Sequence, residues 1–224
     1  MRRRSARVSR RFFATNSEAL ARRLLGCVLV RTTASGEQMS GVIVETEAYC
    51  GVVDRASHAW NGRRTPRNES MYGLPGTAYV YFTYGMHHCF NVVCGTVGDP
   101  LAVLVRALEP CAGVDSMRVR RGRDEPTDLC SGPGKLCQAM GIDRDLDGLD
   151  LTDDERLWIE RPSPRAADRS PKIEIATGPR IGLGEVGEWK DKPLRFYRRG
   201  NVHVSRGTGV AGRAGRATRR ANRG

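Results

Sequence analysis

Residues 75–91 read PGTAYVYFTYGMHHCFN, and this stretch sets the fold because it predicts a complete β-hairpin. The first strand runs from Thr77 to Thr83, the tip is Tyr84-Gly85-Met86, and the second strand returns from His88 to Cys94. Side chains alternate along the first strand, as they do when opposite faces of a sheet meet different surroundings. The two faces carry Tyr79, Tyr81 and Thr83 on one side and Val80 and Phe82 on the other, with Tyr79 and Phe82 expected in the core.

Other short apolar runs predict further strands around this hairpin. They are Cys27–Arg31, Gly41–Thr46 after a turn at Gly36, and Leu101–Leu108. Helices are expected after the capping pattern Thr15-Asn16-Ser17-Glu18 and at Val114–Arg120, Gly134–Met140 and Thr152–Ile159. The sequence therefore predicts an α+β fold: a single domain with a curved, mainly antiparallel, open-barrel-like sheet surrounded by helices.

Length and composition agree with one domain. A chain of 224 residues with 39% hydrophobic content can bury a core. The Pro-rich piece Arg161–Pro179 is the one linker candidate, but strand-like sequence resumes after it. A membrane span needs about 20 consecutive apolar residues, and no such run is present, so a soluble protein is expected.

The net charge of +12 lies in the two ends of the chain. Residues 1–11 and 206–224 carry six arginines each and no acid, whereas all 25 acids lie between residues 12 and 205. We expect two basic, disordered tails around a formally neutral domain at 12–205. Such tails either are simply solvated or raise non-specific affinity for phosphates along DNA.

The N-terminal sequence and the cysteines indicate where in the cell the protein is expected. Ser9–Ala14 reads SRRFFA, which resembles a twin-arginine export signal, but the apolar stretch that should follow is missing. The seven cysteines are an odd number without CxxC or Cys/His metal spacing, which predicts reduced thiols. A cytoplasmic, nucleoid-associated protein is expected.

Candidate chemistry begins at ETEAY, Glu45 to Tyr49. Alternation puts Glu45 and Glu47 on the same face, so that either could be the functional acid. His58 and TPRN (Thr65 to Asn68) follow before the tyrosine-rich hairpin. An acid, a histidine and tyrosines around one flat pocket would suit a nucleobase.

Several motifs in this order resemble one family. Besides the segments above, the chain contains VLVRALEP (Val103 to Pro110), LCSGPGKLCQAMGI (Leu129 to Ile142) and GEWKDKPLRFY (Gly187 to Tyr197). Over residues 12–205 the chain resembles the mammalian-type alkyladenine (3-methyladenine) DNA glycosylases. The resemblance implies base excision repair: a damaged purine is flipped out of duplex DNA, and its N-glycosidic bond is hydrolysed to leave an abasic site.

The resemblance also implies a role for each site residue. It selects Glu47 over Glu45 to activate water, with Arg106 positioning this water and a nearby phosphate. The implied substrates are 3-methyladenine and hypoxanthine, with ethenoadenine as a further candidate. The remaining roles are base binding by Tyr49, His58, Tyr81 and Asn91, insertion into the duplex by Tyr84 and Met86, and phosphate binding by Lys135.

A strand-cleaving lyase would need an amine. The four lysines, Lys135, Lys172, Lys190 and Lys192, all lie outside the Glu45–Asn91 segment, so a monofunctional glycosylase is expected. No cofactor and no metal are expected. Asp143–Gly148 begins like a calcium-binding loop, but its eighth position is Asp150 and its closing position Asp154, where an apolar residue and a glutamate belong.

Some positions depart from the family pattern. His87 and His88 replace aromatic residues common in mammalian relatives, and Cys50 follows Tyr49, which affects base range and wedge geometry. The partner is expected to be double-stranded DNA with damaged purines, bound by a monomer away from membranes. Two other classes stay open: a non-catalytic DNA- or RNA-binding protein, and a carbohydrate hydrolase that uses Glu45 and Glu47.

Overall fold

A computed structural model of the chain describes residues 7–83, 85–162 and 173–205. Two predictions lie wholly or partly outside these residues: the wedge residue Tyr84, and the tails over residues 1–6 and 206–224. The strands are β1 (Val28–Thr32), β2 (Gln38–Tyr49), β3 (Ala78–Thr83), β4 (His87–Cys94), β5 (Leu101–Ala112), β6 (Leu157–Glu160), β7 (Ile175–Gly178) and β8 (Arg195–Arg198). The α-helices are α1 (Arg10–Phe13), α2 (Ser17–Leu24), α3 (Val114–Arg121), α4 (Pro126–Leu129) and α5 (Pro133–Met140).

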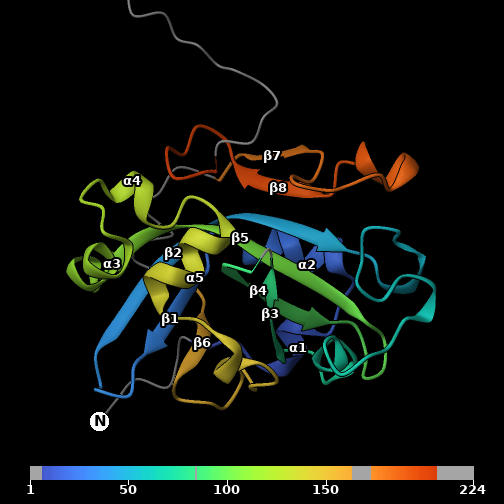
Figure 1. Ribbon diagram of the computed structural model, residues 1–224, viewed down its shortest axis with the longest axis horizontal. Coiled ribbons are helices and arrows are strands. Elements are labelled where there is room, and N and C mark those ends of the chain that lie inside the picture. Colours follow the sequence, from blue (N-terminus) through green and yellow to red (C-terminus); the bar gives the residue numbers. More distant parts are fainter. Residues whose placement is uncertain (1–6, 84, 163–172, 206–224) are drawn as a thin grey trace, which may run out of the picture.

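The described strands form one curled antiparallel sheet, as predicted (Figure 1). Its order is β3-β4-β5-β2-β1-β6, and β8 joins β2 with β7 beside it. The long strand β2 is central: it pairs with β5 along one edge, and with β1 and then β8 along the other. Its register with β5 is broken on both sides of Glu45, which marks a β-bulge there.

One face of the sheet packs in the hydrophobic core and the other lines a cavity. Side chains alternate along each strand, so neighbouring residues point to different faces. On β5, Val103 and Val105 belong to the main hydrophobic core, whereas Leu104 and Arg106 line a cavity. The same division holds on β3, β4 and β2. Cavity residues on those strands are Tyr49, Tyr79, Tyr81, Thr83, Cys89 and Asn91.

Helices α2 and α5 complete the core. Leu20 and Leu24 of α2 and Leu136 and Met140 of α5 are fully buried in one cluster with the strands. Helix α2 begins one residue later than predicted, because the cap is the Asn16 side chain, which accepts from the Ala19 amide at 2.8 Å.

The start of α5 lies close to the hairpin of β3 and β4. A Cβ at Gly134 would come within 2.9 Å of the His87 ring, so that only glycine allows this approach. The predicted helix over Gly134–Met140 is confirmed, with its first residue at Pro133.

The predicted helix at Thr152–Ile159 is wrong. Residues 157–160 form the strand β6, which pairs with β1, and Leu157 and Ile159 are buried in alternation. Residues 152–155 read TDDE, which resembles a helix-capping box, but Asp154 accepts from the Arg156 amide at 2.7 Å and no helix starts here. Phe82 was expected in the core, but it is 43% exposed on the outer face of the hairpin.

The fold begins before residue 12, so the described end of the predicted N-terminal tail belongs to the domain. Val8 is buried, Arg7 forms a β-bridge with Glu160, and Arg10 makes an ion pair with Asp150. No described helix combines the length and the apolar composition of a membrane span.

Candidate active site

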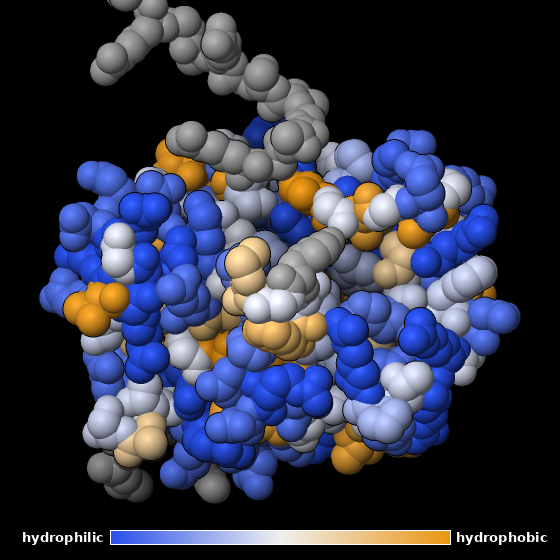
Figure 2. All heavy atoms as spheres, viewed as in Figure 1, coloured by the Kyte–Doolittle hydropathy of each residue, from blue (hydrophilic) through white to orange (hydrophobic). Residues whose placement is uncertain are grey.

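A cavity of about 590 Å³ opens on the face of the sheet that does not pack against the helices. Hydrophilic side chains cover most of the surface shown in Figure 2, and apolar ones gather towards its middle. The cavity walls come from β2 to β5, from the loop over residues 55–68 and from residues 181–186. Segments that are far apart in the sequence therefore build one site.

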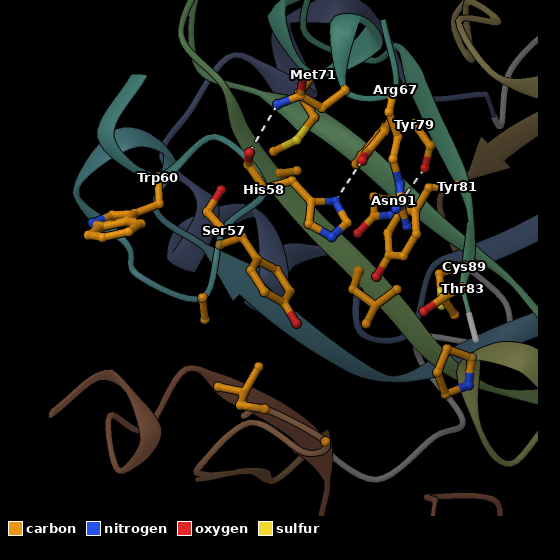
Figure 3. A pocket seen from close by; sticks show the side chains of 18 of the residues that line it. Ser57, His58, Trp60, Arg67, Met71, Tyr79, Tyr81, Thr83, Cys89 and Asn91 are labelled. Carbon is orange, nitrogen blue, oxygen red and sulfur yellow. Dashed lines mark hydrogen bonds between the residues drawn. The ribbon is translucent and has the colours of Figure 1, made fainter. Parts of the chain in front are cut away.

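Aromatic rings form one wall of the cavity (Figure 3). The centroids of His58 and Tyr81 lie 4.5 Å apart, nearly edge to face, and those of Tyr79 and Tyr81 lie 5.3 Å apart. The Tyr79 hydroxyl lies 2.7 Å from Nδ1 of His58. Asn91 donates from Nδ2 to the Tyr79 carbonyl at 3.1 Å, so its amide is fixed beside the same wall.

His58 is an uncharged ring at neutral pH. The side chain is exposed towards the cavity, but the concave wall displaces much of its water. This desolvation, together with the charges of Arg67 and Arg63, lowers the pKa of His58 to about 4.

The TPRN segment explains how the loop with His58 is held. Asn68 is buried, and its Nδ2 donates to the carbonyls of His58 at 3.1 Å and Arg63 at 2.8 Å. Its Oδ1 accepts from the amide and hydroxyl of Thr65 at 2.7 and 2.9 Å. One side chain thus satisfies four backbone and hydroxyl groups, a role the sequence did not reveal.

The two glutamates of β2 lie on opposite sides of Arg106. Glu45 and Glu47 are both fully buried, and Arg106 contacts Glu45 through Nε and Glu47 through Nη1, each at 3.1 Å. Burial alone would lower the pKa of Arg106, but Glu47 and Glu45 more than offset this and raise it. The expectation that the two acids share a face is confirmed despite the bulge at Glu45.

Glu47 lies directly behind the cavity wall. It accepts from the Ile181 amide at 2.7 Å and from the Tyr49 hydroxyl at 3.2 Å, and Ile181, Tyr49 and Arg106 all line the cavity. Burial raises the pKa of Glu47 above its ordinary value, although Arg106 and the Ile181 amide oppose this shift. A carboxylate in this state accepts a proton more readily than one in water.

Tyr49 also lines the cavity, and its ring packs on a buried ion pair. The guanidinium of Arg180 lies 4.6 Å from the centre of the Tyr49 ring and binds Asp54 through two contacts of 2.6 and 2.9 Å. Asp54 also accepts from the amides of Cys50 and Ala56, each at 3.0 Å. Arg180, Asp54 and Ile181 were not among the predicted site residues.

A second cavity, of about 330 Å³, lies on the other side of Arg106. Lys135 and Ser131 line it from the start of α5, and Ser205 from the C-terminal segment. The Lys135 side chain is 43% exposed and lies 3.8 Å from Asp128 and 3.5 Å from the Ser131 hydroxyl. Arg106 is the residue that the two cavities share.

The predicted site residues are thus largely brought together. Tyr49, His58, Tyr81, Asn91 and Arg106 line the first cavity with Glu47 behind them, and Lys135 lines the second. Met86 is 71% exposed at the tip of the hairpin and lines neither cavity.

Residues 11–202 match the family described as methylpurine-DNA glycosylase (MPG). The chain belongs to this family. It is 46% identical over 210 residues to the DNA-3-methyladenine glycosylase of Mus musculus and 45% identical over 208 residues to that of Homo sapiens, covering 90% and 89% of this chain. It spans 62% and 68% of the lengths of these two relatives. A putative 3-methyladenine DNA glycosylase of Desulfitobacterium hafniense is 42% identical over 207 residues, covering 89% of this chain and 98% of that protein.

Proposed function

We propose that the protein is a DNA glycosylase of base excision repair that releases 3-methyladenine and hypoxanthine from duplex DNA, with ethenoadenine as a further substrate. The observation that carries this proposal is the buried Glu47, held by Arg106, Tyr49 and the Ile181 amide directly behind an aromatic cavity. Two relatives, from Mus musculus and Homo sapiens, are DNA-3-methyladenine glycosylases, which supports the reaction and the base.

The cavity suits a flipped purine in size and in lining. Small-molecule sites are commonly about 300–1,000 Å³, and this one falls within that range. The base lies between Tyr49 on one side and His58 and Tyr81 on the other, and stacking contributes about 1–3 kcal/mol per base. This offsets much of the few kcal/mol needed to extrude the base. Asn91, fixed on the Tyr79 carbonyl, limits the space beside the base and disfavours the amino group of guanine.

Glu47 acts as the general base. It takes a proton from a water molecule, whose oxygen bonds to the anomeric carbon while the bond from that carbon to the base nitrogen breaks. The electron pair of the broken bond leaves with the base. The raised pKa of Glu47 makes the carboxylate a stronger base, and the Arg106 guanidinium helps to orient the water.

DNA phosphates lie along the basic side of the site. Arg106 and Lys135 meet at the second cavity, where the start of α5 also presents backbone amides to an anion. Met86, exposed at the hairpin tip, inserts next to the base pair that loses its purine, and Tyr84 fills the gap. The protein works as a cytoplasmic monomer, and its arginine-rich ends aid scanning along the duplex.

The enzyme is monofunctional. A lyase forms a Schiff base through an amine, and among the described residues that line the first cavity the basic side chains are arginines and His58, with no lysine. The product is therefore an intact strand with an abasic site.

The test is base release from duplexes that carry hypoxanthine or 3-methyladenine, comparing the wild type with Glu47→Gln, with and without alkali. We expect release that depends on Glu47, and strand breakage only after alkali. DNA binding without release from any lesion would identify a binding protein, and wild-type release by Glu47→Gln would overturn the mechanism.

A further inference from the structure

The His58 ring is held on one edge and free on the other. Its Nδ1 lies 2.7 Å from the Tyr79 hydroxyl, and Nε2 makes no hydrogen bond with any described residue. Figure 3 shows the second ring nitrogen pointing away from Tyr79, towards the cavity. Whether Nε2 donates or accepts a hydrogen bond therefore depends on which of the two nitrogens carries the hydrogen.

The hydrogen-bond network decides between the two arrangements. His58 is neutral, because its pKa is about 4, and burial raises the pKa of Tyr79, so that its phenol keeps its hydrogen. If Nδ1 donated to the phenol oxygen, the phenol hydrogen would need another acceptor. Tyr79 is 2% exposed, and among the described residues His58 is the one hydrogen-bond partner of its hydroxyl.

The opposite arrangement satisfies the phenol hydrogen and Nδ1 and leaves the Nε2 hydrogen facing the cavity. The phenol donates to Nδ1, which is the stronger acceptor of the two atoms, and the ring hydrogen is on Nε2. Asn68 holds the backbone of His58 through its carbonyl, and Tyr81 packs against the ring with centroids 4.5 Å apart. The first contact fixes the backbone of His58, and the second limits the movement of its ring.

We propose that Tyr79 is a positioning residue that fixes His58 as the Nε2–H tautomer, so that the cavity presents a permanent N–H donor to a lone pair of the bound base. This proposal rests on the function proposed above. It gives Tyr79 a task beyond packing in the apolar cluster to which it belongs.

The fixed donor discriminates between neutral and cationic bases. When the bond to the sugar breaks, its electron pair moves to the base, so that a neutral base gains negative charge while a cationic one becomes neutral. An N–H donor at a base lone pair stabilises the first kind of leaving group more than the second. Hypoxanthine therefore depends on Tyr79, and 3-methyladenine depends on it less.

The experiment uses the full chain labelled with ¹⁵N at histidine, with the His58 signals assigned by comparison with His58→Gln. We expect a wild-type ring with hydrogen on Nε2 and none on Nδ1. A wild-type ring with hydrogen on Nδ1 overturns the proposal, whatever the activity.

Single-turnover release of hypoxanthine and of 3-methyladenine is then compared in Tyr79→Phe, which keeps the aromatic ring. We expect the rate for hypoxanthine divided by the rate for 3-methyladenine to fall about tenfold. A factor of this size corresponds to the loss of one neutral hydrogen bond. The matched control is Tyr72→Phe, since Tyr72 packs on the same cluster but bonds the Arg63 carbonyl at 2.9 Å. An unchanged ratio in Tyr79→Phe overturns the proposal.

The failure of this proposal and the failure of the proposed function are distinguishable. If the wild type releases no base, the function proposed for the protein is wrong, while the NMR signals still report the tautomer. If the wild type releases both bases but the His58 ring carries its hydrogen on Nδ1, only the role proposed for Tyr79 is wrong.

Discussion

The surroundings of Glu45 and Glu47 differ although the two residues are separated by one position on β2 and are equally buried. Glu45 accepts from Arg106 at 3.1 Å, from Arg195 at 3.2 Å, and from the amide and hydroxyl of Ser205 at 2.7 and 2.9 Å. Glu47 shares Arg106, but its other donors are the Ile181 amide and the Tyr49 hydroxyl.

This difference predicts a structural role for Glu45 and fits the proposed chemical role of Glu47. Glu45 is enclosed by two guanidiniums and the C-terminal segment, so its charge is compensated and unavailable. Glu47 has one guanidinium, a raised pKa, and donors that belong to the cavity wall. Two identical side chains on one strand therefore have different hydrogen-bond donors.

Base release gives the largest expected contrast between the two residues. Glu47→Gln lowers the single-turnover rate by about a hundredfold to ten-thousandfold, the usual contribution of a general base. Glu45→Gln, measured under conditions where it is folded, retains a rate within about tenfold of the wild type, because Glu47 keeps its own donors. Equal losses in the two variants would remove the distinction.

Stability shows the reverse contrast. Glu45→Gln leaves Arg195, which is 8% exposed, without its carboxylate, and we expect the free energy of unfolding to fall by about 3–5 kcal/mol. Chemical denaturation monitored by circular dichroism measures this, with Glu47→Gln as the matched control. A loss below about 1 kcal/mol would show that Glu45 is not the structural acid.

The pH dependence of stability isolates the cost of ionising Glu47. Its folded pKa is raised above the ordinary 4.5, so the native state is penalised once the unfolded chain releases this proton. We therefore expect Glu47→Gln to have a higher free energy of unfolding than the wild type near pH 7. The advantage shrinks as the pH falls through 4.5, because both states bind the proton below this pH. Unfolding titrations from pH 4.5 to 8 measure it, and a constant difference would contradict the raised pKa.

Ser205→Ala gives the smallest expected effect. It removes the hydroxyl contact to Glu45 but keeps the backbone amide contact, so the free energy of unfolding should fall by about 1 kcal/mol. Ser35→Ala is the control, because Ser35 is an exposed turn residue that bonds Thr33. Equal values for the two variants would show that Ser205 adds nothing to the enclosure of Glu45.

Much of the fold could be predicted because its signals are local. Alternation within β3, β4 and β5 reports which residues face the core, and the predicted and observed strand limits differ by one residue on β3 and β4. The strand β6 was missed because it has four residues and follows a sequence that mimics a helix start. This segment is a strand because it pairs with β1, and β1 lies too far away in the sequence for a local pattern to show the pairing.

The site was predictable to the extent that its residues lie in dense motifs. Glu47 and Tyr49 belong to the ETEAY motif, and Tyr81 and Asn91 belong to the hairpin, so each pair could be found from a short segment. The contacts that hold them could not, since Ile181 is 134 residues from Glu47 and Arg180 is 126 residues from Asp54. Contacts between residues so far apart in the sequence can be recognised only in the folded structure.

The separation between the glutamates and their donors also sets the order in which the site matures during synthesis. Glu45 is made 150 residues before Arg195 and 160 before Ser205, and β8 pairs with β2 across a similar interval. A nascent chain that has already produced β1 to β5 still lacks these donors to Glu45 and the Ile181 amide that donates to Glu47. The contacts of Glu47 are therefore completed only when residue 181 has been made, and a chain that ends before this residue lacks the amide that donates to Glu47.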